Sequence, residues 1–330
     1  MAFSAKTRRY LIAFLILGWS ITIIYYLLRA NPPKYRLEAK QLYRNNRLLM
    51  GTIWEITSPD KQAGTIVFAE ASRIEQLLSK YIASSEISRL NRLGKLKVSA
   101  ETFYIIKKSR EFYQLSQGAF DITAAPLIDL WGFTNRKFQV PSDDKIRAVL
   151  KFVGSDKIIL HENDNVVEFK IPGMKIDLGA IAKGFALDYA VKKLKENNIK
   201  SCLINAGGQV YALGDKFGIP WKIAIRGTTE SEIAGTLELK NESASTSGNY
   251  EQFFLKNGKR YCHIIDPQTG YPARTPITSV TVIADTGLEA DALSTAALIL
   301  GRDKIKGLKQ EFPETKFYIQ PGNLYEKRKP

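Results

Sequence analysis

The sequence predicts an α+β fold: a single domain behind an N-terminal transmembrane helix. Segments with the alternation of strands and segments with helical spacing are mixed, but they do not follow the regular βαβ order of a doubly wound sheet. A hydrophobic content of 45% and a charged content of 25% are ordinary for a globular protein. No internal repeat or low-complexity segment interrupts residues 35–330. One mixed core of helices and strands is therefore expected.

The elements expected in the first part of this domain follow from periodicity and turn residues. Apolar positions at helical spacing favour two long amphipathic helices, and a polar turn between two β-rich runs favours a hairpin. In order, we expect a strand over residues 51–57, helices over 64–81 and 100–115, a hairpin of strands 158–160 and 166–169, a short strand over 174–178, and a helix from the glycine-bearing turn 179–184 to residue 196.

The remaining elements are mostly strands. Asn257-Gly258 is a typical two-residue hairpin turn, because both residues tolerate positive φ. We expect strands over 202–205, 221–226 and 235–239, a hairpin of strands 250–255 and 260–265, a strand over 278–284 and a helix over 287–300.

The N-terminus carries a membrane signal. Lys6, Arg8 and Arg9 precede the uncharged residues 10–28, and these 19 residues, at about 1.5 Å rise each, match a hydrocarbon core of about 30 Å. Basic residues before the span favour a cytoplasmic N-terminus. A cleaved signal peptide is the alternative.

This pattern divides the chain in two. Residues 1–36 are expected to form a cytoplasmic basic tip, a transmembrane signal anchor and a linker, and residues 37–330 the folded domain. The expected location is the inner or cytoplasmic membrane, with the domain facing the periplasm or the cell exterior.

Charge and cysteine content limit the classes of function. The net charge of +15 suits a phosphorylated ligand or anionic lipid, but no basic stripe interleaved with aromatic residues or known reader motif indicates nucleic acid. Cys202 and Cys262 lie in apolar, strand-like runs without zinc-site spacing. A disulfide between them is open if the compartment is oxidising.

Two segments invite a phosphate or a metal. Residues 176–184 lead from a strand through a glycine turn into a helix, whose free N–H groups attract anions beside Lys183. Asp291 and Thr295 lie four apart on the last predicted helix, so their hard oxygens share one face and suit Mg²⁺. The alternatives are an ordinary strand-turn-helix and an exposed Asp with a Thr bonded to its own helix.

A third segment carries a candidate base. His263 precedes the tight turn Asp266-Pro-Gln-Thr-Gly270, and it is one of only two histidines in the chain. Its ordinary pKa suits a general base at neutral pH. A strand histidine with a structural hydrogen bond is the alternative.

Seven blocks in order resemble the ApbE family, the FAD:protein FMN transferases. The resemblance extends over residues 37–320 and rests on Met50-Gly-Thr52, Ser85-Glu-Ile-Ser-Arg-Leu-Asn91, Gly118-Ala-Phe-Asp-Ile-Thr123, residues 176–184, Asn205-Ala-Gly-Gly208, residues 263–270 and residues 289–295. It implies the family's own type of α+β domain, with FAD in a cleft and Mg²⁺ on its pyrophosphate.

The resemblance also implies roles for individual residues. The metal ligands would be Asp291 and Thr295, with the backbone oxygens of Ala180 and Ser294, and His263 would be the base. The residues expected to contact FAD are Met50, Tyr81, Ala119, Phe120, Asp121, Asp177, Lys183 and Ile265. The acceptor would be a flavin-carrying subunit of a membrane redox complex or an exported reductase.

The expected reaction is Mg²⁺-dependent transfer of FMN from FAD to a Thr or Ser side chain of a target protein, with release of AMP. The alternatives are an Mg²⁺-dependent FAD pyrophosphatase and a non-catalytic, membrane-anchored flavin-binding protein. In relatives that hydrolyse FAD, an Asn is found where this chain has Tyr81. Tyr81 therefore favours transfer.

Overall fold

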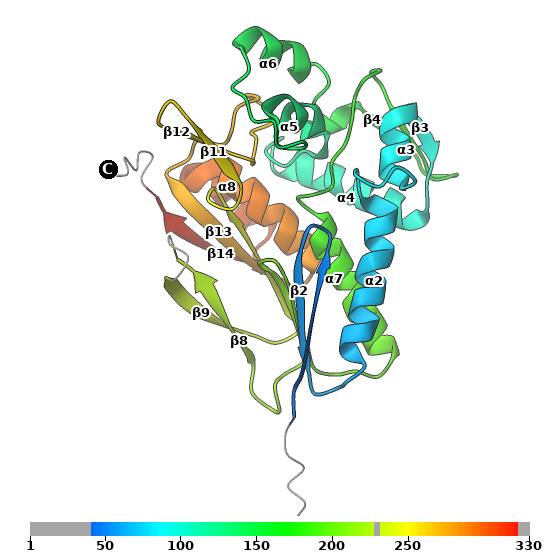
Figure 1. Ribbon diagram of the computed structural model, residues 1–330, viewed down its shortest axis with the longest axis vertical. Helices are drawn as coiled ribbons and strands as arrows, with labels where there is room; N and C mark the ends of the chain where they lie inside the picture. The colour runs from blue at the N-terminus through cyan, green and yellow to red at the C-terminus, as the bar shows by residue number, and fades with distance from the viewer. Residues whose placement is uncertain (1–40, 228–231, 323–330) are drawn as a thin grey trace, which may run out of the picture. The chain divides into compact units, whose positions relative to one another are not determined.

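A seven-stranded antiparallel sheet forms the centre of the fold (Figure 1). The computed structural model describes residues 41–227 and 232–322. In sheet order the strands are β1 (Tyr43–Leu49), β2 (Thr52–Ser58), β6 (Cys202–Ala206), β7 (Gln209–Leu213), β10 (Glu242–Gly248), β13 (Ile277–Ala284) and β14 (Lys316–Pro321). Every neighbouring pair is antiparallel.

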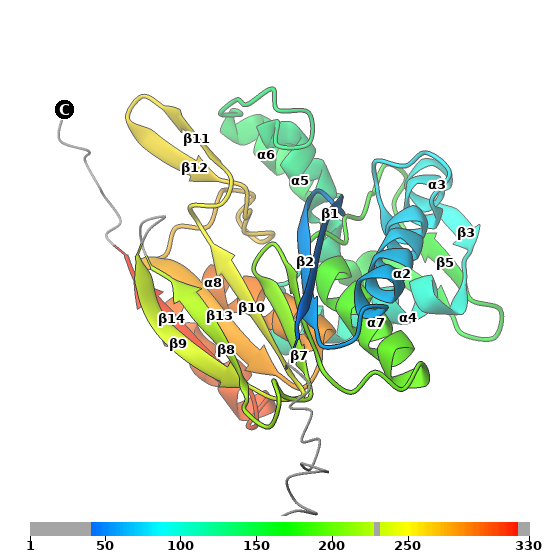
Figure 2. The ribbon, with the colours of Figure 1, turned by 60° about the horizontal axis from the view of Figure 1, so that its bottom comes forward.

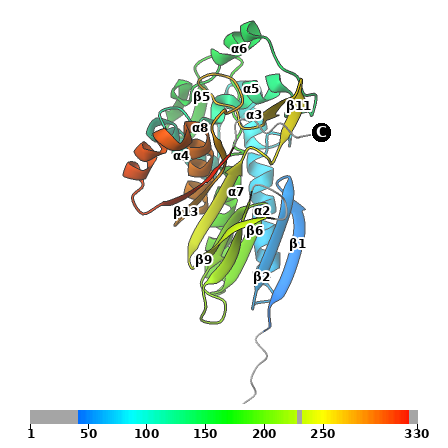
Figure 3. The same ribbon diagram turned by 90° about the vertical axis from the view of Figure 1, so that its left-hand side faces the viewer.

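Three helices cover one face of this sheet (Figures 1 and 3). They are α2 (Ala63–Leu78), α7 (Ala182–Glu196) and α8 (Gly287–Glu311). The main core lies between these helices and the sheet, where Leu293 of α8 and Val282 of β13 are buried together. On the opposite face, the ribbon of β8 (Trp221–Arg226) and β9 (Ile233–Leu239) covers a smaller core, as Figure 2 shows. The central sheet is therefore buried on both faces over its middle strands.

The chain between α2 and α7 forms a mainly helical layer. It contains α3 (Glu86–Leu93), β3 (Lys95–Lys97), α4 (Ala100–Leu115), η1 (Ile122–Ala124), α5 (Ala125–Trp131), α6 (Asp143–Leu150), η2 (Ser155–Lys157), β4 (Ile158–His161) and β5 (Val166–Phe169). Its strands form a small antiparallel sheet in the order β3-β5-β4.

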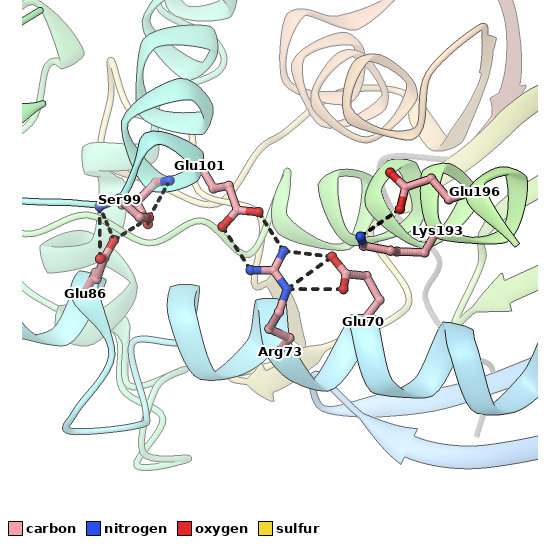
Figure 4. Close-up of polar contacts among 8 residues, drawn as sticks. Glu70, Arg73, Glu86, Ser99, Glu101, Lys193 and Glu196 are labelled. Carbon is pink, nitrogen blue, oxygen red and sulfur yellow. Dashed lines mark hydrogen bonds and ion pairs between the residues drawn. The ribbon is translucent and has the colours of Figure 1, made fainter.

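Arg73 ties α2 to this layer (Figure 4). Its guanidinium lies 2.7 Å from Glu70 on its own helix and 2.7 Å from Glu101 in the first turn of α4. Glu86 of α3 accepts from the backbone N–H of Ser99, whose hydroxyl caps α4. Because Glu70 is buried, its charge requires such a partner.

The strands β11 (Phe253–Lys256) and β12 (Lys259–Cys262) form a hairpin of their own beside α5 and α6 (Figure 2). Asn257 and Gly258 both have positive φ, at 50° and 70°, as a type I′ turn requires. Phe254 and Tyr261 face inward and pack on Trp131 of α5. This hairpin is referred to below as the 253–262 hairpin.

The predicted α+β class and most of the predicted elements are confirmed, but the strand expected over residues 174–178 is wrong. This segment is extended without strand partners, because the side chain of Asn91 takes both backbone groups of Ile176. The N–H of Asp177 donates to the carbonyl of Ile122. These contacts replace a sheet ladder.

Three further outcomes concern the helices, the cysteines and the membrane span. The last helix runs to Glu311, beyond the expected residue 300, with a non-helical residue at Gly301. Cys202 and Cys262 are both buried and free, so the open possibility of a disulfide is not realised.

In residues 41–227 and 232–322 no helix is long and apolar enough to cross a membrane. The span predicted at residues 10–28 lies outside the described residues and stays a prediction.

Glycines allow α7 and α8 to meet closely. A Cβ on Gly184 would lie 2.0 Å from the backbone oxygen of Gly287. We therefore expect Gly184→Ala to push the helices apart and to lower the free energy of unfolding by about 1–3 kcal/mol. Urea denaturation measures this change.

The matched control for this prediction is Gly307→Ala, on the exposed side of α8. An added Cβ there meets nothing within 4 Å, so the higher helix propensity of Ala should stabilise the protein by about 0.5–1 kcal/mol. Equal stability of the two variants would contradict the close contact.

Candidate active site at the contact of two helices

Asp291 is the buried charge at the contact between α7 and α8. Its side chain is only 6% exposed. Its Oδ2 accepts a hydrogen bond of 3.0 Å from the backbone N–H of Gly184, in the first turn of α7, where backbone N–H groups lack helical partners. The Nζ of Lys183 lies 3.9 Å from its Oδ1. The turn at residues 176–184, which the sequence predicted to bind an anion, therefore contacts Asp291, the predicted metal ligand.

Asp188 fixes how the two helices meet. Its carboxylate accepts from the N–H groups of Gly287 and Leu288, at 2.6 and 2.9 Å, at the N-terminus of α8. Burial raises the pKa of Asp188 to about 6, although the two N–H donors act in the opposite direction. These two hydrogen bonds fix the position of α8 along α7, which places Asp291 opposite Gly184.

Serines of β10 form the floor of the site. The hydroxyl of Ser245 donates to Asp291 at 3.4 Å. The hydroxyl of Ser247 lies 2.8 Å from that of Ser294 and 3.2 Å from that of Thr295. Because Ser294 is fully buried and also donates to the carbonyl of Asp291, its side chain is occupied, whereas Thr295 is only partly buried.

A second charged pair lies at the start of the same turn. Lys80, two residues after the end of α2, places its Nζ 2.8 Å from Asp177. Desolvation lowers the pKa of Lys80, but the charge and hydrogen bond of Asp177 outweigh it and the net pKa is raised. Asp177 also accepts from the N–H of Gly179, and the carbonyl of Gly179 accepts from Lys183. Lys80, Asp177 and Lys183 thus form one chain of contacts.

His263 follows β12 and approaches these groups. Both its backbone N–H and its Nδ1 lie against the carbonyl of Gln252, at 2.9 and 3.2 Å. Burial lowers its pKa and nearby Lys183 lowers it further, against opposing effects of Gln252 and Asp177. A neutral imidazole whose Nδ1–H donates to a carbonyl has an unprotonated Nε2. His263 is therefore suited to accept a proton.

Glu251 approaches the site from the base of the hairpin. Part of its side chain is exposed, but partial desolvation raises its pKa to about 7, Lys183 lowers it and Asp291 raises it. Glu251 lies four residues after Ser247, whose hydroxyl contacts Thr295 of α8. Segments distant in sequence, namely the 177–184 turn, α8 and the start of the hairpin, therefore converge on one site.

The ApbE family model matches residues 50–319. The chain belongs to the ApbE family. It is 33% identical over 261 residues to the FAD:protein FMN transferase of Haemophilus influenzae, covering 76% of this chain and 75% of that protein. It is 32% identical over 273 residues to the FAD:protein FMN transferase of Escherichia coli, covering 78% of each chain.

Solved structures of the ApbE family agree with the fold. The ApbE protein of Thermotoga maritima aligns with a TM-score of 0.79 and 33% identity, over 86% of this chain and 97% of that one. The flavin transferase ApbE of Vibrio cholerae aligns with a TM-score of 0.75 and 27% identity, over 85% and 97%. The match extends over nearly the full length of both structures.

The other residues expected to contact FAD lie in different environments. Met50 is in the β1–β2 turn, where its N–H donates to Glu75. Tyr81 follows Lys80, whose Nζ lies 5.1 Å from its ring, and it is 69% exposed. Met50 is partly buried and packs against the main core. The contact of both residues with FAD stays a prediction.

Four expected FAD contacts are buried or occupied. The side chains of Ala119, Phe120 and Ile265 are at most 4% exposed, so a ligand would meet mainly their backbone. Asp121 Oδ1 accepts from Thr123 and Ser155. The carboxylate of Asp121 therefore shapes the loop rather than facing open space.

The oxygen donors fit a magnesium ion. Asp291 and Thr295 offer a carboxylate and a hydroxyl as hard donors, which Mg²⁺ prefers. The backbone oxygens of Ala180 and Ser294 stay predicted ligands. Within residues 41–227 and 232–322 no three His, Cys, Asp or Glu side chains cluster as metal ligands. With a single carboxylate, such a site would depend on further oxygens from a phosphorylated ligand.

Sequence reasoning missed Lys80, Asp188, Ser245, Ser247 and Glu251. The serines had a usable signal, because Ser243, Ser245 and Ser247 alternate at the period of a strand. Asp188 and Lys80 act through partners about 100 positions away in the chain, and no local pattern reveals such pairs.

The Lys80–Asp177 pair yields a test of the site. Lys80→Met leaves the partly buried Asp177 without its ionic partner, so we expect a loss of about 1–3 kcal/mol in unfolding free energy. FAD binding should weaken about 10-fold or more, because an uncompensated carboxylate repels the pyrophosphate. Urea denaturation and flavin fluorescence titration measure the two effects.

The double variant Lys80→Met/Asp177→Asn is the control for this pair. It removes both charges, so the double variant should recover part of the unfolding free energy that Lys80→Met loses. Strictly additive effects of the two substitutions would contradict a coupled pair.

Proposed function

We propose that this chain is an FAD:protein FMN transferase, which moves FMN from FAD to a Thr or Ser side chain of another protein and releases AMP. The observation that carries this proposal is the buried contact of Asp291 with the Gly184 N–H and the Lys183 ammonium, at the turn that leads into α7. The ApbE family membership and the relatives that bear this name at 32–33% identity support it.

Each group has a role that its surroundings favour. When bound to Asp291, Thr295 and the carbonyl of Ala180, Mg²⁺ would neutralise negative charge on the pyrophosphate. Lys183, at the first turn of α7, would bind a phosphate oxygen with its ammonium group. Asp177, whose oxygens contact Lys80 and the Gly179 N–H, would help to orient FAD.

The reaction can be written with balanced atoms. The acceptor hydroxyl oxygen forms a bond to the phosphorus of the FMN half, and the bond from that phosphorus to the oxygen shared with AMP breaks. The hydroxyl proton passes to Nε2 of His263, and AMP leaves with the bridging oxygen. Lys183 would stabilise the charge that grows on this oxygen.

Membrane anchoring and the class of acceptor belong to the same proposal. The uncharged residues 10–28, preceded by basic residues, support an N-terminal anchor that keeps the domain on the outer side of the cytoplasmic membrane. The acceptor would then be a flavin-carrying subunit of a membrane redox complex or an exported reductase.

Intact-mass spectrometry tests the proposed reaction. The protein, FAD, Mg²⁺ and a candidate acceptor from the same cell should give an FMN-sized mass gain on the acceptor together with AMP. EDTA should abolish the gain, and Asp291→Ala should slow it at least about 100-fold, because the only carboxylate donor is lost. Asp303→Ala, an exposed carboxylate on the same helix, is the matched control.

The other outcomes of this experiment point elsewhere. AMP and free FMN with every acceptor unmodified would replace transfer by hydrolysis of FAD. Intact FAD in the presence of Mg²⁺ would leave a flavin-binding protein.

The pH dependence of transfer tests the role of His263. Only the neutral imidazole accepts a proton, and burial lowers its pKa below 6.5. The rate should therefore hold as pH falls to 6.5 and decline only below this value. In His263→Gln the rate should drop by about 100- to 10,000-fold and this acid limb should disappear. An unchanged acid limb in the variant would exclude His263 as the base.

A further inference from the structure

The 253–262 hairpin combines exposed apolar residues with positive charge. Leu255 is 63% exposed and Phe253 is 36% exposed. The hairpin carries Lys256, Lys259 and Arg260, and none of its residues is Asp or Glu. Exposed apolar residues gathered beside charges of one sign are typical of a surface that binds a partner.

The two faces of the hairpin differ. Phe254 and Tyr261 point into the aromatic cluster around Trp131. Phe253 and Leu255 lie on the other face, where the guanidinium of Arg260 is 4.4 Å from the Phe253 ring. Among the described residues, no third strand pairs with β11 or β12. Phe253 and Leu255 are thus exposed on the outer face, beside strand edges that pair with no other described strand.

Both ends of the hairpin lead to the site. His263 directly follows β12, and Glu251 lies two residues before β11. Glu251 also follows β10, whose Ser247 lies 3.2 Å from the hydroxyl of Thr295 in the site. A chain lying along the hairpin from its tip toward its stem would thus reach the reacting groups.

We propose that the 253–262 hairpin is the docking surface for the acceptor protein, and that it takes an extended acceptor segment with acidic and apolar residues next to the modified Thr or Ser. This inference rests on the proposed function, because transfer requires a protein segment to enter the site. The positive charge of the hairpin selects acidic residues, and Phe253 and Leu255 supply apolar contact area.

An anionic lipid surface is the other class of partner for apolar and basic residues. The arrangement favours a peptide, because the apolar residues do not stop at the tip. Phe253 pairs with Cys262, next to His263, so the apolar track continues to the stem of the hairpin. A flat membrane would contact mainly the tip.

The test variant is Leu255→Asp/Lys256→Glu/Lys259→Glu, which changes exposed side chains only. The matched control is Ile233→Asp/Lys192→Glu/Lys195→Glu, which makes the same change of charge at exposed positions on β9 and α7. The probe is a short fluorescein-labelled peptide with a central threonine flanked by aspartate, glutamate and leucine. A second peptide with lysine in place of the acids serves as the comparison.

Fluorescence anisotropy should show that the wild type prefers the acidic peptide. The hairpin variant should bind it at least about 10-fold more weakly, since two favourable charges are reversed and one apolar contact is lost. The control variant should bind like the wild type, and flavin fluorescence should give the same FAD affinity for all three proteins. In FMN transfer to a protein acceptor, the hairpin variant should show a higher KM for the acceptor and the same kcat as the wild type.

Each contrary result has a distinct meaning. Equal peptide binding by the hairpin variant and the wild type, or equal binding of both peptides, overturns the docking surface. If the hairpin variant loses binding to phosphatidylglycerol vesicles but binds the peptide like the wild type, the hairpin contacts the membrane. This result also overturns the docking surface. Hairpin-dependent peptide binding by a protein that transfers FMN to no acceptor would contradict the proposed function, and the hairpin would remain a surface that binds acidic peptides.

Discussion

The hydrogen bond from the Gly184 N–H to Asp291 joins the two halves of the site. A buried carboxylate is costly unless donors and positive charge compensate it. Here the free N–H of the first turn of α7, the hydroxyl of Ser245 and the nearby ammonium of Lys183 supply this compensation. The same groups also set the site's chemistry, because they leave the oxygens of Asp291 directed at the turn where a phosphate would bind.

The remaining parts of the fold hold this contact in place. Gly184 and Gly287 permit the close approach of the helices, and Asp188 fixes their register. The sheet supplies Ser245 and Ser247 from below, and the hairpin brings His263 from the side. This geometry agrees with the function that membership of the ApbE family supports.

The sequence predicted the class of fold, many of the helices and strands, and two residues of the α7–α8 contact, Lys183 and Asp291. Local patterns sufficed where periodicity or turn chemistry determined the structure, as at Asn257-Gly258. They failed at residues 174–178, where the side chain of Asn91 replaces a neighbouring strand. They also missed Lys80 and Asp188, because such residues act through partners about 100 positions away. The location of the N-terminal span is still only a prediction.

The coupling between Mg²⁺ and FAD tests the central claim that one carboxylate and the substrate complete the metal site together. Isothermal titration of Mg²⁺ into the His263→Gln variant, alone and loaded with FAD, measures it, with chromatography to confirm that FAD stays intact. We expect Mg²⁺ to bind at least about 10-fold more tightly when FAD is present, and FAD affinity to rise by the same factor with Mg²⁺, as linkage requires. Equal Mg²⁺ affinity with and without FAD would contradict the account.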